Sequence, residues 1–164
     1  MHIPSCFLRH FVPAAAILLL SGLPAFSADP PAPQVLTGVI VEVTTGDAFL
    51  LRTADNREIP VGVWGIDSPE VNNRTGQQAR KFTARLIEGE SVSITVRARS
   101  GEGRLLGKVT FSGNRDLDEE LLKEGFAVWV TGVAPDEKTY DRAQADAQDA
   151  RKGIWREWLP KKGL

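Results

Sequence analysis

The sequence predicts an α+β protein, a five-stranded β-barrel of the OB-fold type accompanied by three α-helices. The first observation is the order of segments: three strand patterns, a helix pattern and two more strand patterns precede two further helix patterns. The second is the length of 164 residues, which favours a single domain. The third is a composition with 42% apolar and 25% charged residues, which is typical of a soluble globular protein.

The first three strands are expected to form an antiparallel meander between residues 35 and 66. A β-branched run over residues 35–45 is followed by a second apolar run over residues 49–51. The turn signal Ala54-Asp55-Asn56 separates this run from a third one, which extends from Ile59 to Ile66. Short apolar runs divided by turn residues are typical of strands joined by hairpins.

The remaining segments follow in the order expected for such a barrel. Residues 75–87 carry apolar side chains three and four positions apart and end before Gly89, which predicts a helix. Strands are expected over residues 92–96 and 105–111, and an extended segment over residues 126–130. Two more helices are expected over residues 116–124 and 136–152, the latter with an apolar stripe of Tyr140, Ala143, Ala147 and Ala150.

The first 27 residues have the pattern of a secretory signal peptide. Arg9 lies in a weakly basic start, and the uncharged apolar run that follows is too short to span a membrane as a helix. Small residues at Ala25 and Ser27 predict cleavage after Ser27 and disfavour a membrane anchor. We therefore expect an exported protein, periplasmic or secreted. Its expected parts after cleavage are a proline-rich linker (28–34), a folded domain (35–158) and a charged tail (159–164).

The composition of the expected mature chain excludes several kinds of catalytic site. This part of the sequence contains no cysteine and no histidine, and its formal net charge is −2. A thiol nucleophile, a histidine general base and a zinc site of nitrogen and sulfur ligands are therefore excluded. A metal would have to be held by oxygen ligands, which favours calcium or magnesium. The charge balance also argues against a broad basic field around the protein.

Two groups of carboxylates lie at turns. Asp47 follows Gly46 between the first two strands, and Asp67-Ser68-Pro69-Glu70 follows the third strand. Pro69 fixes the backbone of the second turn and so gives Asp67 and Glu70 a defined relative orientation. Acidic residues in turns are usually solvated, so neither group alone predicts a site.

Taken together, five segments of the chain resemble the staphylococcal nuclease family. They are Gly46-Asp47, Trp64-Gly65-Ile66-Asp67-Ser68-Pro69-Glu70, Gly103-Arg104-Leu105-Leu106-Gly107, Leu121 to Gly125 and Gly153-Ile154-Trp155. The resemblance extends from about Val35 to Trp155, and the stretch around Asp67 is its most diagnostic part.

This resemblance implies a calcium-dependent phosphodiesterase that cleaves DNA and RNA. Asp47, Asp67 and the backbone carbonyl of Ser68 match the positions at which the family holds the metal. Glu70 matches the glutamate that positions or deprotonates the attacking water, and Arg104 matches an arginine that contacts the scissile phosphate. The residue types suit these roles, since calcium takes oxygen ligands, a carboxylate can act as a base and a guanidinium fits phosphate oxygens.

The chain departs from the family at a second arginine position, five residues before Asp67, where it has Gly62. Loss of one preorganised donor to a charged transition state costs about 10²–10³ in rate. Arg52 and Arg57 are poor substitutes, because they are expected on the opposite strand face and in a distant turn. Pro60 is also expected to make this strand irregular. The sequence therefore predicts a weakened nuclease.

Other departures leave alternatives open. The family's Asp-Gly-Asp-Thr turn is Thr45-Gly46-Asp47-Ala48 here, and the aromatic residues that stack the nucleotide base are not evident. Trp64 and Trp129 lie in strand-like runs and are expected to pack against the core. The favoured interpretation is an exported, calcium-dependent nuclease with DNA or RNA as its substrate. The main alternative is an inactive module of the same fold that binds nucleic acid or protein, and a weaker one is a phosphodiesterase for another substrate.

Overall fold

The computed structural model describes residues 33–156. The expected signal peptide and its cleavage site, most of the linker and the charged tail lie outside the described residues. No helix within residues 33–156 is long and apolar enough to cross a membrane.

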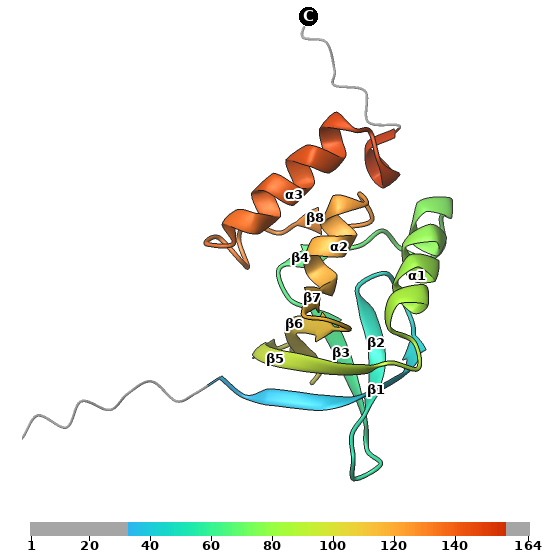
Figure 1. The fold of residues 1–164 in the computed structure, drawn as a ribbon, viewed down its shortest axis with the longest axis vertical. Helices are drawn as coiled ribbons and strands as arrows, with labels where there is room; N and C mark the ends of the chain where they lie inside the picture. The colour runs from blue at the N-terminus through green and yellow to red at the C-terminus, as the bar shows by residue number, and fades with distance from the viewer. Residues whose placement is uncertain (1–32, 157–164) are drawn as a thin grey trace, which may run out of the picture. The chain divides into compact units, whose positions relative to one another are not determined.

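A closed β-barrel forms the centre of the described region (Figure 1). Its strands pair in the order β3-β2-β1-β5-β6, and a parallel pairing of β3 with β6 closes the ring. The predicted five-stranded OB-fold barrel with three α-helices is confirmed. The strands of the barrel are β1 (Val35–Val43), β2 (Ala48–Arg52), β3 (Glu58–Val63), β5 (Ser91–Arg99) and β6 (Leu105–Phe111).

Alternating burial along the strands explains the barrel core. In β6 every second residue is buried, so that Leu105, Val109 and Phe111 face inward with Gly107. This period of two is the pattern of a strand with one face toward a core. The pairing register shifts once in β1, between Ile40 and Glu42, and once in β5. Such bulges bend and twist a strand, which helps the sheet to close.

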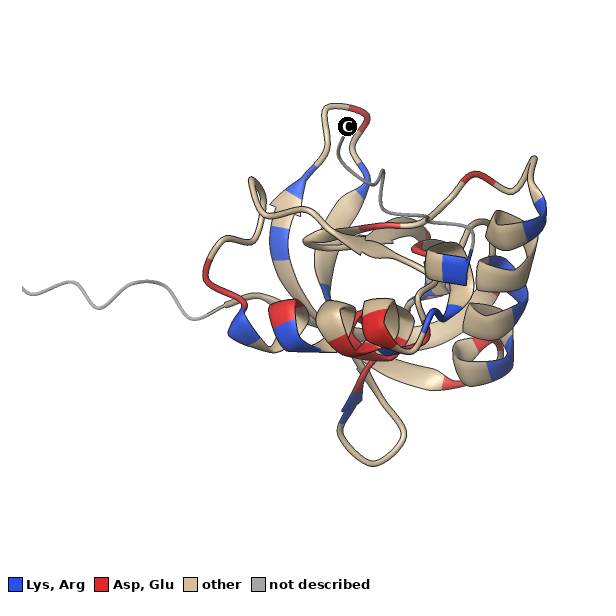
Figure 2. Cartoon of the chain, turned by 90° about the horizontal axis from the view of Figure 1, so that it is seen from above, with Lys and Arg blue, Asp and Glu red and all other residues tan. Residues whose placement is uncertain are grey.

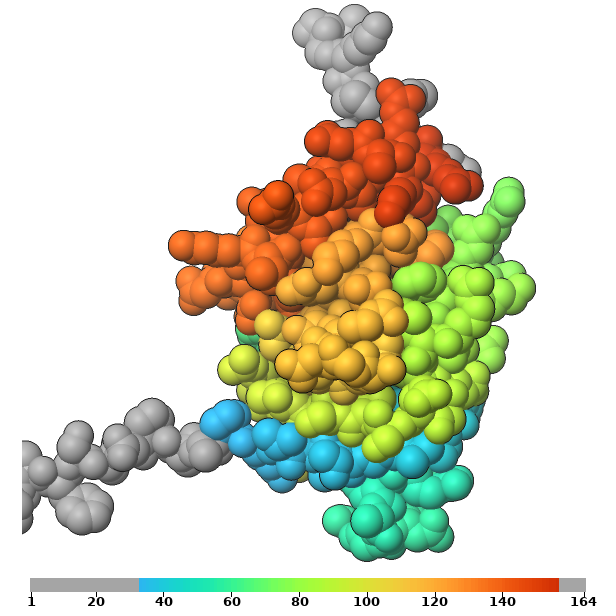
Figure 3. Space-filling view, in the orientation of Figure 1, coloured from blue at the N-terminus to red at the C-terminus, as the bar shows by residue number. Residues whose placement is uncertain are grey.

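Three α-helices and a short 3-10 helix complete the described region. The Asn73 side chain accepts the Gly76 amide at 2.8 Å and caps the N-terminus of α1. In the space-filling view the gold segment that contains α2 lies between α1 in green and α3 in red-orange (Figure 3). The helices are α1 (Arg74–Ile87), α2 (Leu117–Lys123), α3 (Lys138–Asp149) and η1 (Gly153–Arg156).

The third strand is shorter than the sequence predicts. β3 ends at Val63, and the chain turns at Gly65 with a positive φ of 80°. The apolar pattern continues to Ile66 because that residue is also buried, in the separate strand β4 (Ile66–Asp67). β4 pairs with β8 (Val128–Trp129) in a two-stranded sheet, and β7 (Arg115–Asp116) adds to the edge of β6. The β4–β8 pairing joins segments far apart in the sequence, which no local pattern reports, whereas β7 follows β6 in a short hairpin.

The expectation that Pro60 disturbs the third strand is wrong. The β2–β3 register runs without interruption from Ala48 opposite Gly62 to Arg52 opposite Glu58. Pairing with β6 begins only at Val61, so the proline lies just outside the strand's second ladder.

The interface between α2 and α3 contains a buried polar pair. The Tyr140 hydroxyl donates a hydrogen bond to the Asp118 carboxylate, and both residues are 0% exposed. Burial raises the pKa of Asp118, and the hydrogen bond from Tyr140 partly opposes this shift. α3 itself is shorter than predicted, and Ala150 lies at its exposed C-cap instead of in its buried stripe.

Candidate active site

Asp47 lies in the turn between β1 and β2 and is partly buried. The Thr45 hydroxyl donates a hydrogen bond to Asp47 Oδ1 at 2.8 Å. The Val63 amide donates to the Asp47 carbonyl at 2.8 Å, which ties the turn to the end of β3. Burial, with a smaller contribution from the negative charge of Asp67, raises the pKa of Asp47 despite the hydrogen bond from Thr45.

The second carboxylate turn lies against the first. The Ser68 amide points at Asp47 Oδ2, with a nitrogen–oxygen distance of 3.4 Å. Asp67, the residue before it, is exposed at the end of β4. The Ser68 hydroxyl donates to the Phe126 carbonyl at 2.9 Å and so anchors the turn to the segment after α2. The structure thus brings the turn of Asp67 and Ser68 against Asp47, and the assignment of these residues to a metal remains a prediction.

Helix α1 supports both turns with one face. A Cβ at Gly46 would lie 2.6 Å from Ser68 Oγ and 2.8 Å from Ala79 Cβ, so only glycine fits there without movement. The Thr83 hydroxyl donates to the Gly46 carbonyl at 2.6 Å from a fully buried position. A Cβ at Gly76 would overlap the backbone of the Pro69-Glu70 turn. The helix therefore fits closely against the loops that carry the carboxylates.

Glu70 lies in the loop between this turn and α1. It is exposed, and its backbone carbonyl accepts the Asn73 amide at 3.2 Å just before α1. Within the described part of the chain, no three acidic, histidine or cysteine side chains form a group that could hold a metal ion. The structure therefore links Asp47 to the turn of Asp67 and Ser68, while Glu70 is exposed in the loop before α1.

Arg104 lies next to Gly62, the position at which the second arginine is missing. Because β3 and β6 are parallel neighbours, Gly62 lies opposite Leu106. A Cβ at Gly62 would be 3.3 Å from Arg104 Cδ and 3.9 Å from the Asp47 carbonyl oxygen. The aliphatic stem of Arg104 thus lies beside Gly62, near the Asp47 turn. The guanidinium is exposed and takes part in no ion pair among the described residues.

Neither alternative arginine replaces the missing one. Arg52 forms an ion pair with Glu58 at 2.7 Å, and Arg57 forms one with Asp55 at 2.5 Å. Both lie at the β2–β3 hairpin, which projects away from the helices in Figure 1. The prediction that they are poor substitutes is therefore supported by their positions.

Trp64 and Trp129 serve the fold rather than an open stacking platform. Trp64 and Trp129 are half-buried and pack against the core, as predicted. The indole nitrogen of Trp129 donates to the Ala134 carbonyl at 2.9 Å. The Arg97 guanidinium lies 5.7 Å from the centre of a Trp64 ring, in a cation–π arrangement.

Three supporting residues were not identified from the sequence. Thr45 orients Asp47, Thr83 holds the Gly46 carbonyl, and Gly76 admits the Glu70 turn. The sequence offered two signals for them, the hydroxyl of Thr45 two residues before Asp47 and the glycine at position 76 within the helical pattern. Neither indicates its partner, because the partner lies in another segment.

The acidic turns fit an oxygen-ligated cation. Asp47 and Asp67 repel each other, and burial further disfavours the ionised form of Asp47. A divalent cation between them would offset both effects, and the family resemblance implies the Ser68 carbonyl as a neutral third ligand. Carboxylates and a carbonyl are the ligand types that calcium prefers.

Comparisons with known proteins identify the family of this chain. The sequence model of a family described as "Staphylococcal nuclease homologue" matches residues 60–157. A Haemophilus influenzae protein named "Uncharacterized endonuclease" is 27% identical over 116 residues, covering 71% of this chain and 64% of that protein. An Escherichia coli O157:H7 protein of the same name is 24% identical over 149 residues, covering 90% of each chain.

A plant protein shares the same region. The "Probable staphylococcal-like nuclease CAN3" of Oryza sativa subsp. japonica is 30% identical over 106 residues, covering 65% of this chain and 28% of that protein. The chain thus spans less than two thirds of the Haemophilus and rice relatives.

Proposed function

This chain belongs to the staphylococcal nuclease homologue family, and we propose that it is a calcium-dependent nuclease that hydrolyses phosphodiester bonds of DNA or RNA. The observation that carries the proposal is the close packing of the Asp47 and Asp67 turns, next to the stem of Arg104. Relatives named endonuclease support the same class of reaction.

Each predicted residue has a role that suits its position. Asp47, Asp67 and the Ser68 carbonyl would hold the cation, whose chemistry when bound is to polarise a phosphoryl oxygen and neutralise developing charge. Glu70, exposed in the loop before α1, orients and deprotonates the attacking water. Arg104 presents a charged fork to the phosphate from the neighbouring strand. None of these side chains is part of the barrel core.

We also propose that catalysis is weakened at Gly62. The second arginine of the family is absent. Arg52 and Arg57, the two arginines considered as substitutes, form ion pairs at the β2–β3 hairpin, away from the carboxylates. Arg104 is then the arginine that we assign to the phosphate. The signal-like first 27 residues support the further proposal that the protein acts after export, in the periplasm or outside the cell.

The proposal is tested with the purified protein and a fluorescently labelled, denatured DNA. We expect slow cleavage that depends on calcium, stops with a chelator and is lost in Glu70→Gln and Asp67→Asn. Arg52→Gln is the matched control, because it removes an arginine of the same barrel far from the carboxylates. Cleavage that is equally slow in the wild type and in Glu70→Gln would overturn the proposal.

The absent arginine also favours a second candidate, an inactive module of the same fold that binds nucleic acid or protein. It predicts that the wild type binds the labelled DNA without cleaving it at any calcium concentration. The two candidates therefore differ in one measurement, the appearance of shortened products.

A further inference from the structure

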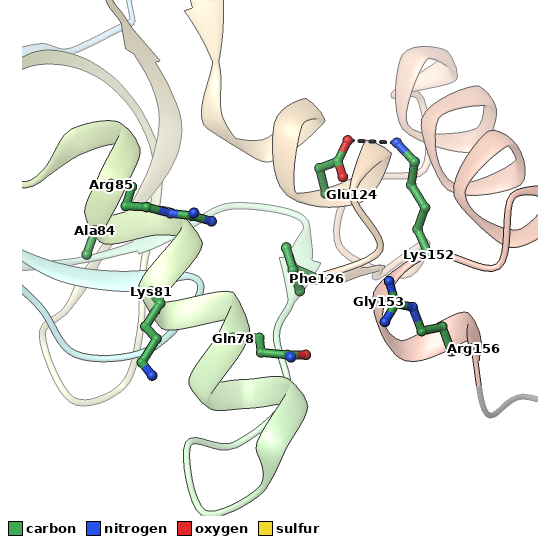
Figure 4. Close-up of a pocket in the computed structure, with 9 residues that line it drawn as sticks. All are labelled: Gln78, Lys81, Ala84, Arg85, Glu124, Phe126, Lys152, Gly153 and Arg156. Atoms are coloured by element: carbon green, nitrogen blue, oxygen red, sulfur yellow. Dashed lines mark hydrogen bonds and ion pairs between the residues drawn. The ribbon is translucent and has the colours of Figure 1, made fainter.

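A second, basic feature lies outside the carboxylate site. A cleft with a volume of about 600 Å³ opens between α1 and the segment that leads into η1 (Figure 4). Its cationic side chains come from both walls, Lys81 and Arg85 from α1, and Lys152 and Arg156 from the region of η1. Glu124 is the one acidic residue among those that line it, so the lining carries a formal net charge of +3.

Most of this positive charge is not neutralised by the protein. Lys152 pairs with Glu124 at 2.7 Å, but none of the ion pairs within residues 33–156 includes Lys81, Arg85 or Arg156. α1 carries four basic residues and no acidic one, and Figure 2 shows basic residues along its length. This concentration is unusual in a chain whose formal net charge is −1.

The cleft and the carboxylate site share their supports. Phe126 lines the cleft, and its carbonyl accepts the hydrogen bond from Ser68 beside Asp47. The Phe126 ring also packs on Phe82 of α1, with ring centres 5.2 Å apart. α1 therefore contacts the carboxylate turns through Gly76, Ala79 and Thr83, while Lys81 and Arg85 on the same helix line the cleft.

We propose that this cleft binds the sugar-phosphate backbone of a single-stranded polynucleotide, as an extension of the substrate site. The inference rests on the proposed action on nucleic acid, since it assigns the cleft to the same substrate. Lys81 and Arg85 are one helical turn apart on one face, so they present a row of charges to a repeating anion. Phe126 and Ala84 add apolar surface on which a base can pack.

The shape and chemistry favour a strand over other anions. The cations line two walls of a hollow, which suits a narrow chain better than a flat membrane surface or a wide duplex. Arginine and lysine side chains with an aromatic group between them are the combination that binds single strands without sequence preference. The rest of the chain has a formal net charge of −4, since the whole chain carries −1 and the cleft lining +3, so long-range attraction of a polyanion favours the cleft.

The test compares two charge reversals with the same spacing and the same residue types. Lys81→Glu/Arg85→Glu alters the cleft, and Lys138→Glu/Arg142→Glu alters the start of α3. All four side chains are exposed, and circular dichroism checks that both variants are folded. The probe is a labelled 24-nucleotide oligothymidylate in a chelator, so that binding is measured without hydrolysis. Affinity is recorded over a range of salt concentrations.

We expect the cleft variant to bind at least about tenfold more weakly than the α3 variant at low salt. Its slope of log affinity against log salt should be shallower by about 1.4, since each phosphate contact on a single strand contributes about 0.7. Equal losses in the two variants, or no loss in either, would overturn the proposal. So would unchanged oligonucleotide binding together with lost binding to phosphatidylserine vesicles, which would assign the cleft to a membrane.

Hydrolysis of a dinucleotide substrate separates this proposal from the nuclease proposal. A dinucleotide has a single phosphodiester, and when this group is at the carboxylates no second one remains for the cleft, so the cleft variant should hydrolyse it as the wild type does. If no substrate is cleaved but the cleft variant loses oligonucleotide binding, the cleft proposal stands and the nuclease proposal falls. If the wild type cleaves nucleic acid and the cleft variant binds the oligonucleotide as well as the wild type does, the nuclease proposal stands and the cleft proposal falls.

Discussion

Restoring an arginine at Gly62 is the sharpest test of why this chain should be a slow nuclease. If the carboxylates and Arg104 form a working site that lacks one phosphate ligand, Gly62→Arg should increase calcium-dependent cleavage. Position 62 is suited to the change, because β3 keeps its register with both neighbours and Gly62 has no left-handed φ that a side chain would strain. A new side chain would start beside Arg104 and the Asp47 turn.

The size of the effect follows from a gain and two costs. One preorganised donor to a charged transition state contributes about 10²–10³ in rate. A Cβ at position 62 would lie 2.9 Å from Leu106 Cδ2 and 3.3 Å from Arg104 Cδ, so two flexible side chains must shift. Added bulk of this kind costs about 1–3 kcal/mol of stability. Two guanidinium groups about 4 Å apart in water also repel by about 1 kcal/mol. The repulsion lowers the gain about fivefold, whereas the steric cost acts on stability, so we expect a gain of about 20-fold to 200-fold.

The assay compares initial rates on a labelled single-stranded DNA for the wild type, Gly62→Arg and Gly62→Ala. The alanine variant carries the steric change without the charge and should stay at the wild-type rate. The gain in Gly62→Arg should disappear when Glu70→Gln is added, because the attacking water then lacks its base. The reasoning is refuted if Gly62→Arg is folded by urea unfolding, binds calcium and cleaves no faster than Gly62→Ala.

Three further predictions concern the metal site, the buried polar pair and the contact of α1. Calorimetry should detect calcium binding with a dissociation constant of about 10⁻⁴–10⁻³ M, and equal heats from the wild type and Asp67→Ala would remove this residue from the site. Burial raises the pKa of Asp118 in the folded state, so the folded protein keeps a proton that the unfolded chain releases. The free energy of unfolding should therefore fall as the pH rises from about 4, the pKa in the unfolded chain, through the higher pKa of the folded state. Urea unfolding should show this decline in the wild type and a smaller one in Asp118→Asn; parallel profiles would contradict it. Gly76→Ala places a methyl group against the Glu70 carbonyl and should cost about 1–3 kcal/mol, whereas Gly101→Ala, in open space, should cost much less; equal costs would argue against the close contact.

Local patterns were sufficient for the barrel and the helices. Alternation in β6 and the spacing of apolar residues in α1 predict the correct element type, because burial on one face imposes a period on each. The break at Gly65 was missed because Ile66 remains buried on the far side of the turn, which prolongs the apolar pattern. An apolar run in the sequence indicates that residues are buried, and it does not distinguish a buried turn from a longer strand.

The site was predictable in part for a different reason. Asp47 and Asp67 were singled out by motif resemblance, and the structure brings their turns together. The pairing of the Arg104 stem with Gly62 was not foreseen, because it depends on the parallel closure of the barrel between β3 and β6. Residue spacing along one strand gives no information on which side chain from another strand fills the space beside a glycine.

Helix α1 links the two proposed sites mechanically. Its inner face touches the carboxylate turns so closely that Gly46 and Gly76 have no room for a side chain. Lys81 and Arg85, which line the cleft, are on this same helix, and the i to i−4 hydrogen bonds of a helix keep such positions at fixed separations. A strand held by these cations would therefore meet the Asp47 and Asp67 pair in one register. Binding at the cleft and positioning at the carboxylates would then be two consequences of the same rigid element.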